Sequence, residues 1–559
     1  MTEHRSVRGN GGGNGGGNDT EVSAPSFIPL DPTGVAGLDE VLGGGIQRGS
    51  LAIIAGPPGG GKTILAHQIA FAAARAGRRT TILTAFSEPT NKLIAHMRSF
   101  TFFDQSLLGQ SLEVLSMQQF LRNGLEDAVG ELVAAVRAAR ADLVVLDGFR
   151  GVRETAERPE EARRFIYEAS NRLSLLGVTL LLTSEANVRD VTFFPEATTA
   201  DVLLGLAFDV IGARERRTLE VLKVRGAAPL PGRHALMISD EGITIYPRIE
   251  ARVARQMGMD RPLGVRRDSG ESRREPEDAQ SAGAPVTTGV PGLDSLLDGG
   301  IARGSGTLLV GKRGAGKTLF GLQFALTGVG LGEPCIFMSF RETTEQLARK
   351  AAPFRWGERF PDAIGSGSLT ILRTPSVELH PDVIADNLIA HLEATGARRL
   401  VVDEVGELER ALIAEGYARR FHDFAAALVE ALRLRGVTSV FTRQTAAGQR
   451  SALEDEMTPT ATLTENLFWL REWSDDGRIR RSLEILQTAV SGRAEFWHPV
   501  TIHAPEGIIM SHEGRQASTD DASGDREHTG NAGKTDANAR GRGARQPRSL
   551  REEGRDDDQ

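Results

Sequence analysis

The chain has 559 residues, of which 40% are hydrophobic and 25% charged, and a formal net charge of -8. This composition is typical of a globular protein and excludes the disordered and fibrous classes, while the length exceeds what one hydrophobic core normally organises. The acidic balance gives no overall attraction to nucleic acid or to an anionic membrane, so we expect neither as a partner.

The N-terminal segment and the lack of long apolar stretches bear on location. Residues 1–25 are rich in Gly and Asn and are predicted to form a flexible arm, because they cannot bury enough apolar surface to offset chain entropy. They contain no apolar signal core, and no stretch of about 18 apolar residues follows in the sequence. The sequence therefore predicts a cytoplasmic protein.

A repeated segment indicates two copies of one domain. The stretch "PTGVAGLDEVLGGGIQRGS" matches "TTGVPGLDSLLDGGIARGS" further along the chain. A polar stretch of mixed charge, "RRDSGESRREPEDAQSAGAP", separates the copies and is typical of a linker. We predict a first domain over 26–263, a linker over 264–285, a second domain over 286–513 and a charged, disordered tail over 514–559.

Each copy of the repeated segment is followed by an apolar run, a glycine loop and a helical pattern. "LAIIA" precedes "GPPGGGKT" in the first copy, and "TLLVG" leads into "GKRGAGKT" in the second. This is the context of a P-loop, whose backbone N–H groups surround phosphates, whose Lys reaches the terminal phosphates and whose Thr binds magnesium. We expect both copies to bind ATP and Mg2+. The expected nucleotide-binding residues are Gly56, Gly59, Gly60, Gly61, Lys62, Thr63, Gly311, Gly314, Ala315, Gly316, Lys317 and Thr318, with Thr63 and Thr318 also on the metal.

Two later apolar runs end in an acid. "RADLVVLDG" contains Asp147 and "RRLVVDE" contains Asp403. Such strands alternate with helical spacers, which predicts an α/β fold with a doubly wound, mostly parallel sheet covered on both faces. We expect both acid-bearing strands to lie next to the P-loop strand, where the carboxylates can hold the water shell of the magnesium.

Hydrolysis also requires a group that orients or deprotonates water. The acid at the end of the strand after the P-loop helix is the expected catalytic residue, which gives Glu88 in "TAFSEPT" and Glu342 in "MSFRETT". A role in capping the next helix is the alternative for both. In the second copy Glu404 directly follows Asp403 and is a further candidate base.

A pair of cations distinguishes the two copies. In "RRTLEVLKVRG" the period of a strand places Lys223 and Arg225 on one face, from which they could contact a triphosphate in a neighbouring subunit. The alternative is a charged edge strand that discourages aggregation. The corresponding stretch of the second copy, "RRSLEILQTAV", has Gln487 and Ala489 at these positions. The second copy therefore lacks the cations.

Over residues 26–512 the sequence resembles the KaiC-like family of two-domain, RecA-like ATPases. The resemblance includes the P-loops, "TGVAGLDEVLGGGIQRGS", "AHMRSFTFFD" and "ARERRTLEVLKVRGAAPLPGRHALMISDEGITIYP". It implies two tandem RecA-like P-loop domains, stacked as two rings of a homohexamer with ATP at the subunit boundaries. It also implies slow hydrolysis in the first ring and, in clock members, autophosphorylation in the second.

The resemblance is incomplete at the residues that carry chemistry. The family's adjacent pair of glutamates corresponds to Ser87-Glu88 in the first copy and to Arg341-Glu342 in the second. One acid is therefore retained in each copy. The glutamate expected to take the proton of a phosphoacceptor is replaced by Arg341.

Other departures concern base recognition and phosphoryl transfer. The Thr and His that follow the cation pair in clock members are Ala227 and Pro229 here, so phosphate contact is retained without these contacts to base or ribose. The phosphothreonine position corresponds to Thr462 and the phosphoserine position to Ala461. We therefore expect weak or absent autophosphorylation.

Our leading hypothesis is a KaiC-like ring ATPase in which the first domain hydrolyses ATP and the second binds it as a regulatory element. One alternative is a clock-type serine/threonine kinase that phosphorylates Thr462. Another is a RecA- or DnaB-like, nucleic-acid-dependent ATPase, although no basic or aromatic loop of the kind that binds single strands is evident. A third is an adaptor that docks signalling proteins through the charged tail.

Overall fold

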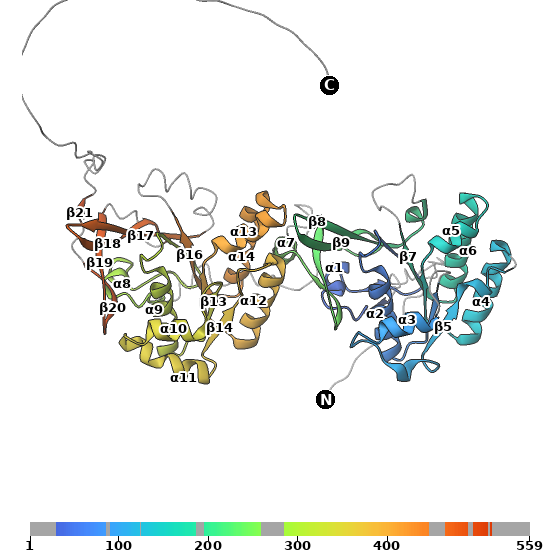
Figure 1. Ribbon diagram of the computed structural model, residues 1–559, viewed down its shortest axis with the longest axis horizontal. Helices are drawn as coiled ribbons and strands as arrows, with labels where there is room; N and C mark the ends of the chain where they lie inside the picture. The colour runs from blue at the N-terminus through green and yellow to red at the C-terminus, as the bar shows by residue number, and fades with distance from the viewer. Residues whose placement is uncertain are drawn as a thin grey trace, which may run out of the picture. The chain divides into compact units, whose positions relative to one another are not determined.

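The computed structural model describes residues 29–84, 90–122, 124–185, 195–258, 284–445, 464–489, 496–511 and 515–516. Two α/β repeats account for these residues, each built on one large sheet (Figure 1). Among the described residues, no helix is both long enough and apolar enough to cross a membrane.

The first repeat contains a short ribbon, a nine-stranded sheet and the helices around it. Its strands are β1 (Leu30–Asp31), β2 (Ile46–Gln47), β3 (Leu51–Ala55), β4 (Thr80–Thr84), β5 (Leu112–Ser116), β6 (Leu143–Asp147), β7 (Thr179–Ser184), β8 (Val202–Ile211), β9 (Arg214–Val224), β10 (Arg233–Ser239) and β11 (Gly242–Tyr246). Its helices are α1 (Leu38–Leu42), α2 (Lys62–Arg75), α3 (Thr90–Met97), α4 (Leu125–Ala139), α5 (Arg150–Thr155), α6 (Pro159–Leu175) and α7 (Ile249–Gln256).

From its P-loop strand to its antiparallel strands the second repeat has the same order of elements, with one additional helix, α11, before β14. Its strands are β12 (Gly306–Gly311), β13 (Cys335–Ser339), β14 (Leu369–Arg373), β15 (Arg399–Asp403), β16 (Thr438–Gln444), β17 (Asn466–Asp475), β18 (Arg478–Gln487), β19 (Phe496–His503), β20 (Gly507–Met510) and β21 (Arg515–Gln516). Its helices are α8 (Pro291–Leu296), α9 (Lys317–Gly330), α10 (Thr344–Ala351), α11 (Phe360–Gly365), α12 (Pro381–Thr395), α13 (Gly406–Ala414) and α14 (Phe421–Arg433).

The strand order confirms the predicted fold and corrects one detail of it. The first sheet runs β11-β10-β9-β8-β3-β7-β6-β4-β5, and the strands from β8 to β5 are parallel. The second sheet runs β14-β13-β15-β16-β12-β17-β18-β19-β20. The expectation that the acid-bearing strands β6 and β15 lie next to the P-loop strands β3 and β12 is wrong. The chain crosses over once more after each acid-bearing strand, so that β7 and β16 take the place beside the P-loop strand.

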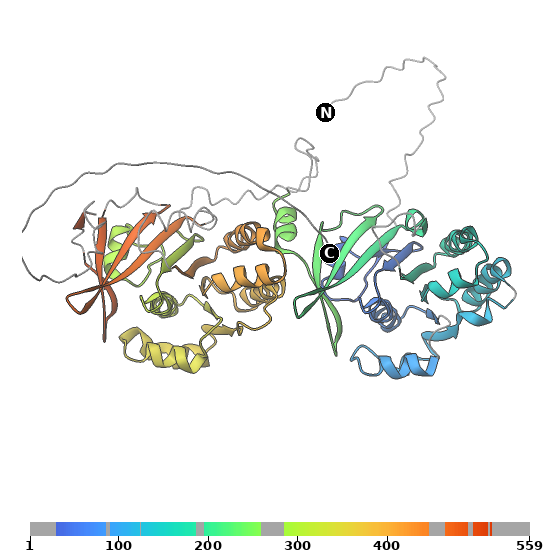
Figure 2. The same ribbon diagram turned by 45° about the horizontal axis from the view of Figure 1, so that its top comes forward.

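Both faces of each sheet are covered, as the apolar runs predicted. In β3 the side chains of Leu51 and Ile53 belong to one hydrophobic cluster, and those of Ala52 and Ile54 belong to another. This alternation follows from the two-residue period of a strand. Helices lie against both faces of the parallel strands, while the antiparallel hairpins β8–β9 and β17–β18 extend each sheet at one side (Figure 2).

A buried histidine of β10 makes stability depend on pH. His234 is 0% exposed, its Nδ1 accepts the backbone N–H of Arg248 at 3.1 Å, and its Nε2 donates to the carbonyl of Leu230 at 3.1 Å. Burial lowers the pKa of His234 to about 4. The unfolded chain therefore takes up this proton near pH 6.5 while the folded chain does not, and stability is lost as the pH falls from 6.5 toward 4.

We predict that this histidine costs the wild type about 2 kcal/mol of unfolding free energy between pH 7 and pH 5. The measurement is the midpoint of urea unfolding at the two pH values, compared with His234→Gln, whose amide can donate and accept but does not titrate. The variant should lose less stability than the wild type over this range. An identical pH dependence in both proteins would contradict the assignment.

Candidate functional site

The first P-loop leads from β3 into α2 through positions that favour glycine. Gly59 has a φ of 76° and Gly61 a φ of 96°, in the left-handed region that other residues rarely adopt. A Cβ atom at Gly56 would lie 2.6 Å from the carbonyl oxygen of Leu206. The loop ends directly at the N-terminus of α2, where free backbone N–H groups favour an anion. This geometry fits a triphosphate.

The second P-loop has the same backbone. Gly314 has a φ of 91° and Gly316 a φ of 118°, and a Cβ atom at Gly311 would lie 2.5 Å from the carbonyl oxygen of Leu470. Ala315 replaces a glycine of the first loop, which is tolerated because its φ is not positive. The second loop therefore also fits a triphosphate.

The P-loop lysines are held over their own loops. The ammonium of Lys62 donates to the carbonyl of Pro57 at 2.9 Å, and that of Lys317 donates to the carbonyls of Gly311 at 2.8 Å and Lys312 at 3.0 Å. Burial lowers the pKa of both lysines, while neighbouring carboxylates oppose this effect. Both cations are thus positioned where phosphate oxygens would enter the loop.

The P-loop threonine and the strand-end aspartate of each copy lie together, although another strand separates the P-loop strand from the acid-bearing strand. Thr63 Oγ1 donates to Asp147 Oδ1 at 3.2 Å, and Thr318 Oγ1 donates to Asp403 Oδ2 at 2.9 Å. Thr183, at the end of the intervening strand β7, donates to Asp147 at 2.6 Å. Hydroxyl and carboxylate oxygens suit Mg2+, so these residues would hold the metal and its water shell.

The first P-loop borders a cleft of about 490 Å³. Its lining includes Lys62, Thr63, Asp147, Glu185 and Arg217. The two last residues were not singled out from the sequence. Glu185 directly follows β7 and Arg217 lies on β9, and both elements are far from the P-loop in the sequence.

Arg217 of β9 contacts the P-loop itself. Its Nε donates to the carbonyl of Gly59 at 3.1 Å, and its guanidinium lies 4.5 Å from the centre of the Phe208 ring. The corresponding residue in β18 is Arg481, which pairs with Glu472 at 2.8 Å. The repeated "RR" in "RRTLEVL" and "RRSLEIL" was the available signal.

A histidine lies behind the candidate magnesium site of the first repeat. His67 on α2 is 0% exposed, and its Nε2 lies 3.5 Å from Asp147 Oδ2. The equivalent residue on α9 is Leu322. Nothing in the sequence marked this histidine, because a single His in an apolar helix carries no spacing pattern.

The acids expected to activate water differ in their surroundings. Glu88 lies outside the described residues. Glu342 forms an ion pair with Lys350 of α10, and its backbone N–H donates to Ser339 Oγ at 3.0 Å. Glu404 is 7% exposed and accepts the backbone N–H of Gln444 at 2.7 Å. Burial raises the pKa of Glu404, an effect that this hydrogen bond and the charge of nearby Lys317 oppose.

Arg341 neutralises an acid beside the second site. It pairs with Glu407 of α13 at 3.0 Å, and Arg410 pairs with the same carboxylate at 2.5 Å. A cation therefore occupies the position that carries a glutamate in the family that this sequence resembles. No proton acceptor is present at that position of the second copy.

The cations of the first repeat lie at the end of β9. The strand ends at Val224, one residue before the point that the sequence pattern assumed, so Arg225 follows the strand. Arg225 pairs with Asp201 at 3.1 Å, and Lys223 donates to the carbonyl of Thr198 at 3.1 Å. Burial and the positive charge of Arg225 lower the pKa of Lys223, which indicates that the two cations are neighbours.

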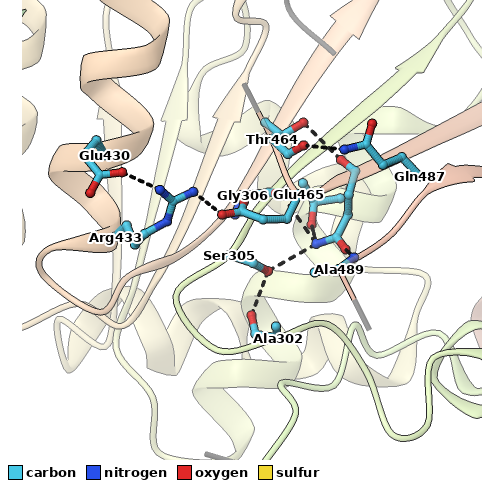
Figure 3. A network of polar contacts seen from close by, with 11 residues as sticks. Ala302, Ser305, Gly306, Glu430, Arg433, Thr464, Glu465, Gln487 and Ala489 are labelled. Atoms are coloured by element: carbon cyan, nitrogen blue, oxygen red, sulfur yellow. Dashed lines mark hydrogen bonds and ion pairs between the residues drawn. The ribbon is translucent and has the colours of Figure 1, made fainter. Parts of the chain in front are cut away.

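We call the end of β9 with the start of β8 the corner of the first repeat, and the end of β18 with the start of β17 the corner of the second. In the second repeat this corner is a network of polar contacts (Figure 3). Gln487 Nε2 donates to the carbonyl of Thr464 at 3.4 Å, and the backbone N–H of Ala489 donates to Asn466 Oδ1 at 3.2 Å. Glu465, at the position of Asp201, accepts the backbone N–H of Gly306 at 2.7 Å. The candidate phosphoacceptor Thr462 lies outside the described residues.

The arginine partner of this acid comes from another element in the second repeat. Arg433, at the end of α14, pairs with Glu465 and with Glu430 of its own helix. Two carboxylates thus neutralise one guanidinium. No cation of β18 is presented here, in contrast to the end of β9.

Comparison with known proteins assigns a family to both repeats. The family model described as "ATPase: KaiC" matches residues 31–250 and 286–515. The circadian clock oscillator protein KaiC of Picosynechococcus sp. is 26% identical over 481 residues, which cover 83% of this chain and 85% of the relative. That of Thermostichus vulcanus is 26% identical over 491 residues, with 84% and 85% coverage. The circadian clock oscillator protein KaiC 1 of Synechocystis sp. is 26% identical over 506 residues, with 86% and 88% coverage.

Proposed function

Because the chain belongs to the KaiC family of ATPases, with two repeats of its domain, we propose that the first repeat hydrolyses ATP and that the second binds ATP with little or no turnover. The observation that carries this proposal is the difference between the two corners described above. Lys223 and Arg225 are neighbouring cations in the first repeat, whereas Gln487 and Ala489 make uncharged hydrogen bonds to Thr464 and Asn466 in the second. We further propose that the protein acts in the cytoplasm in signalling or regulation.

The two cations act between subunits in this proposal. Arg225 lines a groove of about 710 Å³ in which three arginines, Arg225 with Arg163 and Arg164 of α6, outnumber the two acids Glu160 and Asp201. Such a surface suits the triphosphate that a neighbouring P-loop presents, and the homohexamer implied by the family resemblance would bring the two together. A guanidinium supplied in this way stabilises the charge that develops on the transferred phosphoryl group.

The remaining residues bind and orient the substrate. The P-loop N–H groups and Lys62 hold the phosphates, and Thr63 with Asp147 would hold the magnesium. When bound, the metal neutralises charge on the phosphate oxygens. Arg217 fixes the P-loop from the side through the Gly59 carbonyl, which restrains the loop in its binding conformation.

The second repeat retains the residues that would bind the phosphates and the magnesium. Lys317, Thr318 and Asp403 have the contacts of their counterparts, and Glu404 remains as a buried acid. Arg341 replaces the glutamate that would accept a proton, so we expect this repeat to bind ATP without efficient turnover. We propose that this repeat reports nucleotide occupancy to a protein partner, for which the charged tail 514–559 is the proposed contact.

A clock-type kinase is the second candidate function, because Glu342, Glu404 and Thr462 are all retained. We predict that purified protein incubated with Mg-ATP carries no phosphate at Thr462, since the base and the cations that transfer requires are replaced. Phosphopeptide mass spectrometry checks this. Phosphate at Thr462 that is absent from Lys317→Ala would establish autokinase activity and contradict the prediction.

A further inference from the structure

A carboxylate follows the strand that lies beside the first P-loop strand. β7 pairs with β3 along its length, Ala55 opposite Ser184, and Glu185 is the next residue of the chain. The carboxyl ends of parallel strands meet at one edge of a sheet, which is where the P-loop begins. The corrected strand order therefore brings Glu185, rather than only the end of β6, beside the phosphate-binding loop.

Glu185 faces the nucleotide cleft. It lines the cleft of about 490 Å³ with Lys62, Thr63 and Asp147, and its side chain is 40% exposed, which leaves it accessible to water. Burial lowers the pKa of Lys62, and the negative charge of Glu185 is the largest effect that opposes this. Glu185 thus lies within electrostatic range of the ammonium that would bind the terminal phosphates.

An arginine of α5 holds this carboxylate by one oxygen. Arg150 Nη1 lies 3.3 Å from Glu185 Oε2, and Arg150 Nε donates to Glu154 at 2.8 Å. Within the described residues this contact leaves Glu185 Oε1 available to accept a hydrogen bond from water. The guanidinium also offsets the repulsion between a carboxylate and a triphosphate.

The second repeat replaces this acid by an amide. Thr183 and Thr442 make the same contact to their strand-end aspartates, so Glu185 corresponds to Gln444 two residues later. The backbone of Gln444 donates to Glu404. An amide cannot accept a proton at neutral pH, so this position of the second site carries no base.

We propose that Glu185 is the general base of the first repeat, the role that the sequence alone gave to Glu88. In the step, the water oxygen bonds to the γ-phosphorus while the bond from that phosphorus to the β–γ bridging oxygen breaks. ADP leaves with the electron pair, and the water proton passes to Glu185 and then to solvent. This inference rests on the proposed ATPase activity of the first repeat.

The experiment compares Glu185→Gln with the wild type in the full-length protein. Loss of the base is expected to lower kcat about 100-fold, while KM changes less than about 3-fold because Gln keeps the size of the side chain. A second readout is the nucleotide that remains bound after incubation with Mg-ATP, separated by chromatography. The wild type should yield ADP from its first repeat, and the variant should retain ATP there.

Glu154→Gln is the matched control, because Glu154 shares Arg150 with Glu185 but does not line the cleft. It should hydrolyse ATP like the wild type. Binding of a fluorescent ATP analogue shows that each variant is folded. Normal turnover in Glu185→Gln together with lost turnover in Glu88→Gln would overturn the inference and leave the proposed function intact. Absence of hydrolysis in the wild type would overturn both.

Discussion

Lys62→Ala is expected to lower ATP turnover about 100-fold or more, whereas Lys317→Ala should leave most of it. Each lysine donates charge-assisted hydrogen bonds that a methyl group cannot replace, so each variant loses phosphate binding at its own loop. Only the first loop faces the partner cations Lys223 and Arg225 in our proposal. The measurement is steady-state phosphate release at saturating Mg-ATP.

The two variants serve as controls for each other because the loops have the same geometry. Both lysines are 9% exposed and donate to carbonyls of their own loop at similar distances. A general loss of folding would therefore affect both proteins alike. The reverse ranking, with most turnover lost in Lys317→Ala, would show that the second repeat is the main ATPase.

Arg225→Ala should lower turnover about 1000-fold while ATP binding at the P-loop changes little. The guanidinium would act on a neighbouring subunit's triphosphate, where it stabilises charge that develops only in the transition state. The measurement combines phosphate release with equilibrium binding of a fluorescent ATP analogue. Ala489→Arg is the matched substitution in the second repeat. It introduces a cation at the position equivalent to Arg225, where the wild type has alanine.

Mixing subunits tests whether this arginine acts between them. Lys62→Ala and Arg225→Ala are each inactive in the proposal, but a mixed ring contains boundaries at which an intact P-loop meets an intact arginine. Activity should therefore return in the mixture. If the mixture stays as inactive as its components, Arg225 acts within its own subunit or only stabilises β9 through Asp201.

The P-loops and their acids were predictable because each rests on a local pattern. The order of strand, glycine loop and helix is contiguous in the sequence, and the acids end short apolar runs. The contacts of Thr63 with Asp147 and of Thr318 with Asp403 agree with that prediction. The strand order was not predictable in the same way, because the crossover that follows each acid-bearing strand can return on either side of it.

Residues that reach the site from distant elements were missed for this reason. Glu185 lies beside the P-loop only because β7 inserts between β3 and β6, which no local pattern indicates. Arg225 follows β9 because β8 begins at Val202, which pairs with Val224, the last residue of β9. The exchange of Arg225 for Arg433 as partner of the corner acid likewise joins elements far apart in the sequence.

The most direct test of asymmetric activity is a structure of the full-length protein frozen during incubation with Mg-ATP. We expect ADP, or ADP with phosphate, at Lys62 and intact ATP at Lys317 of the same subunit. Intact ATP at the first loop with ADP at the second would contradict it.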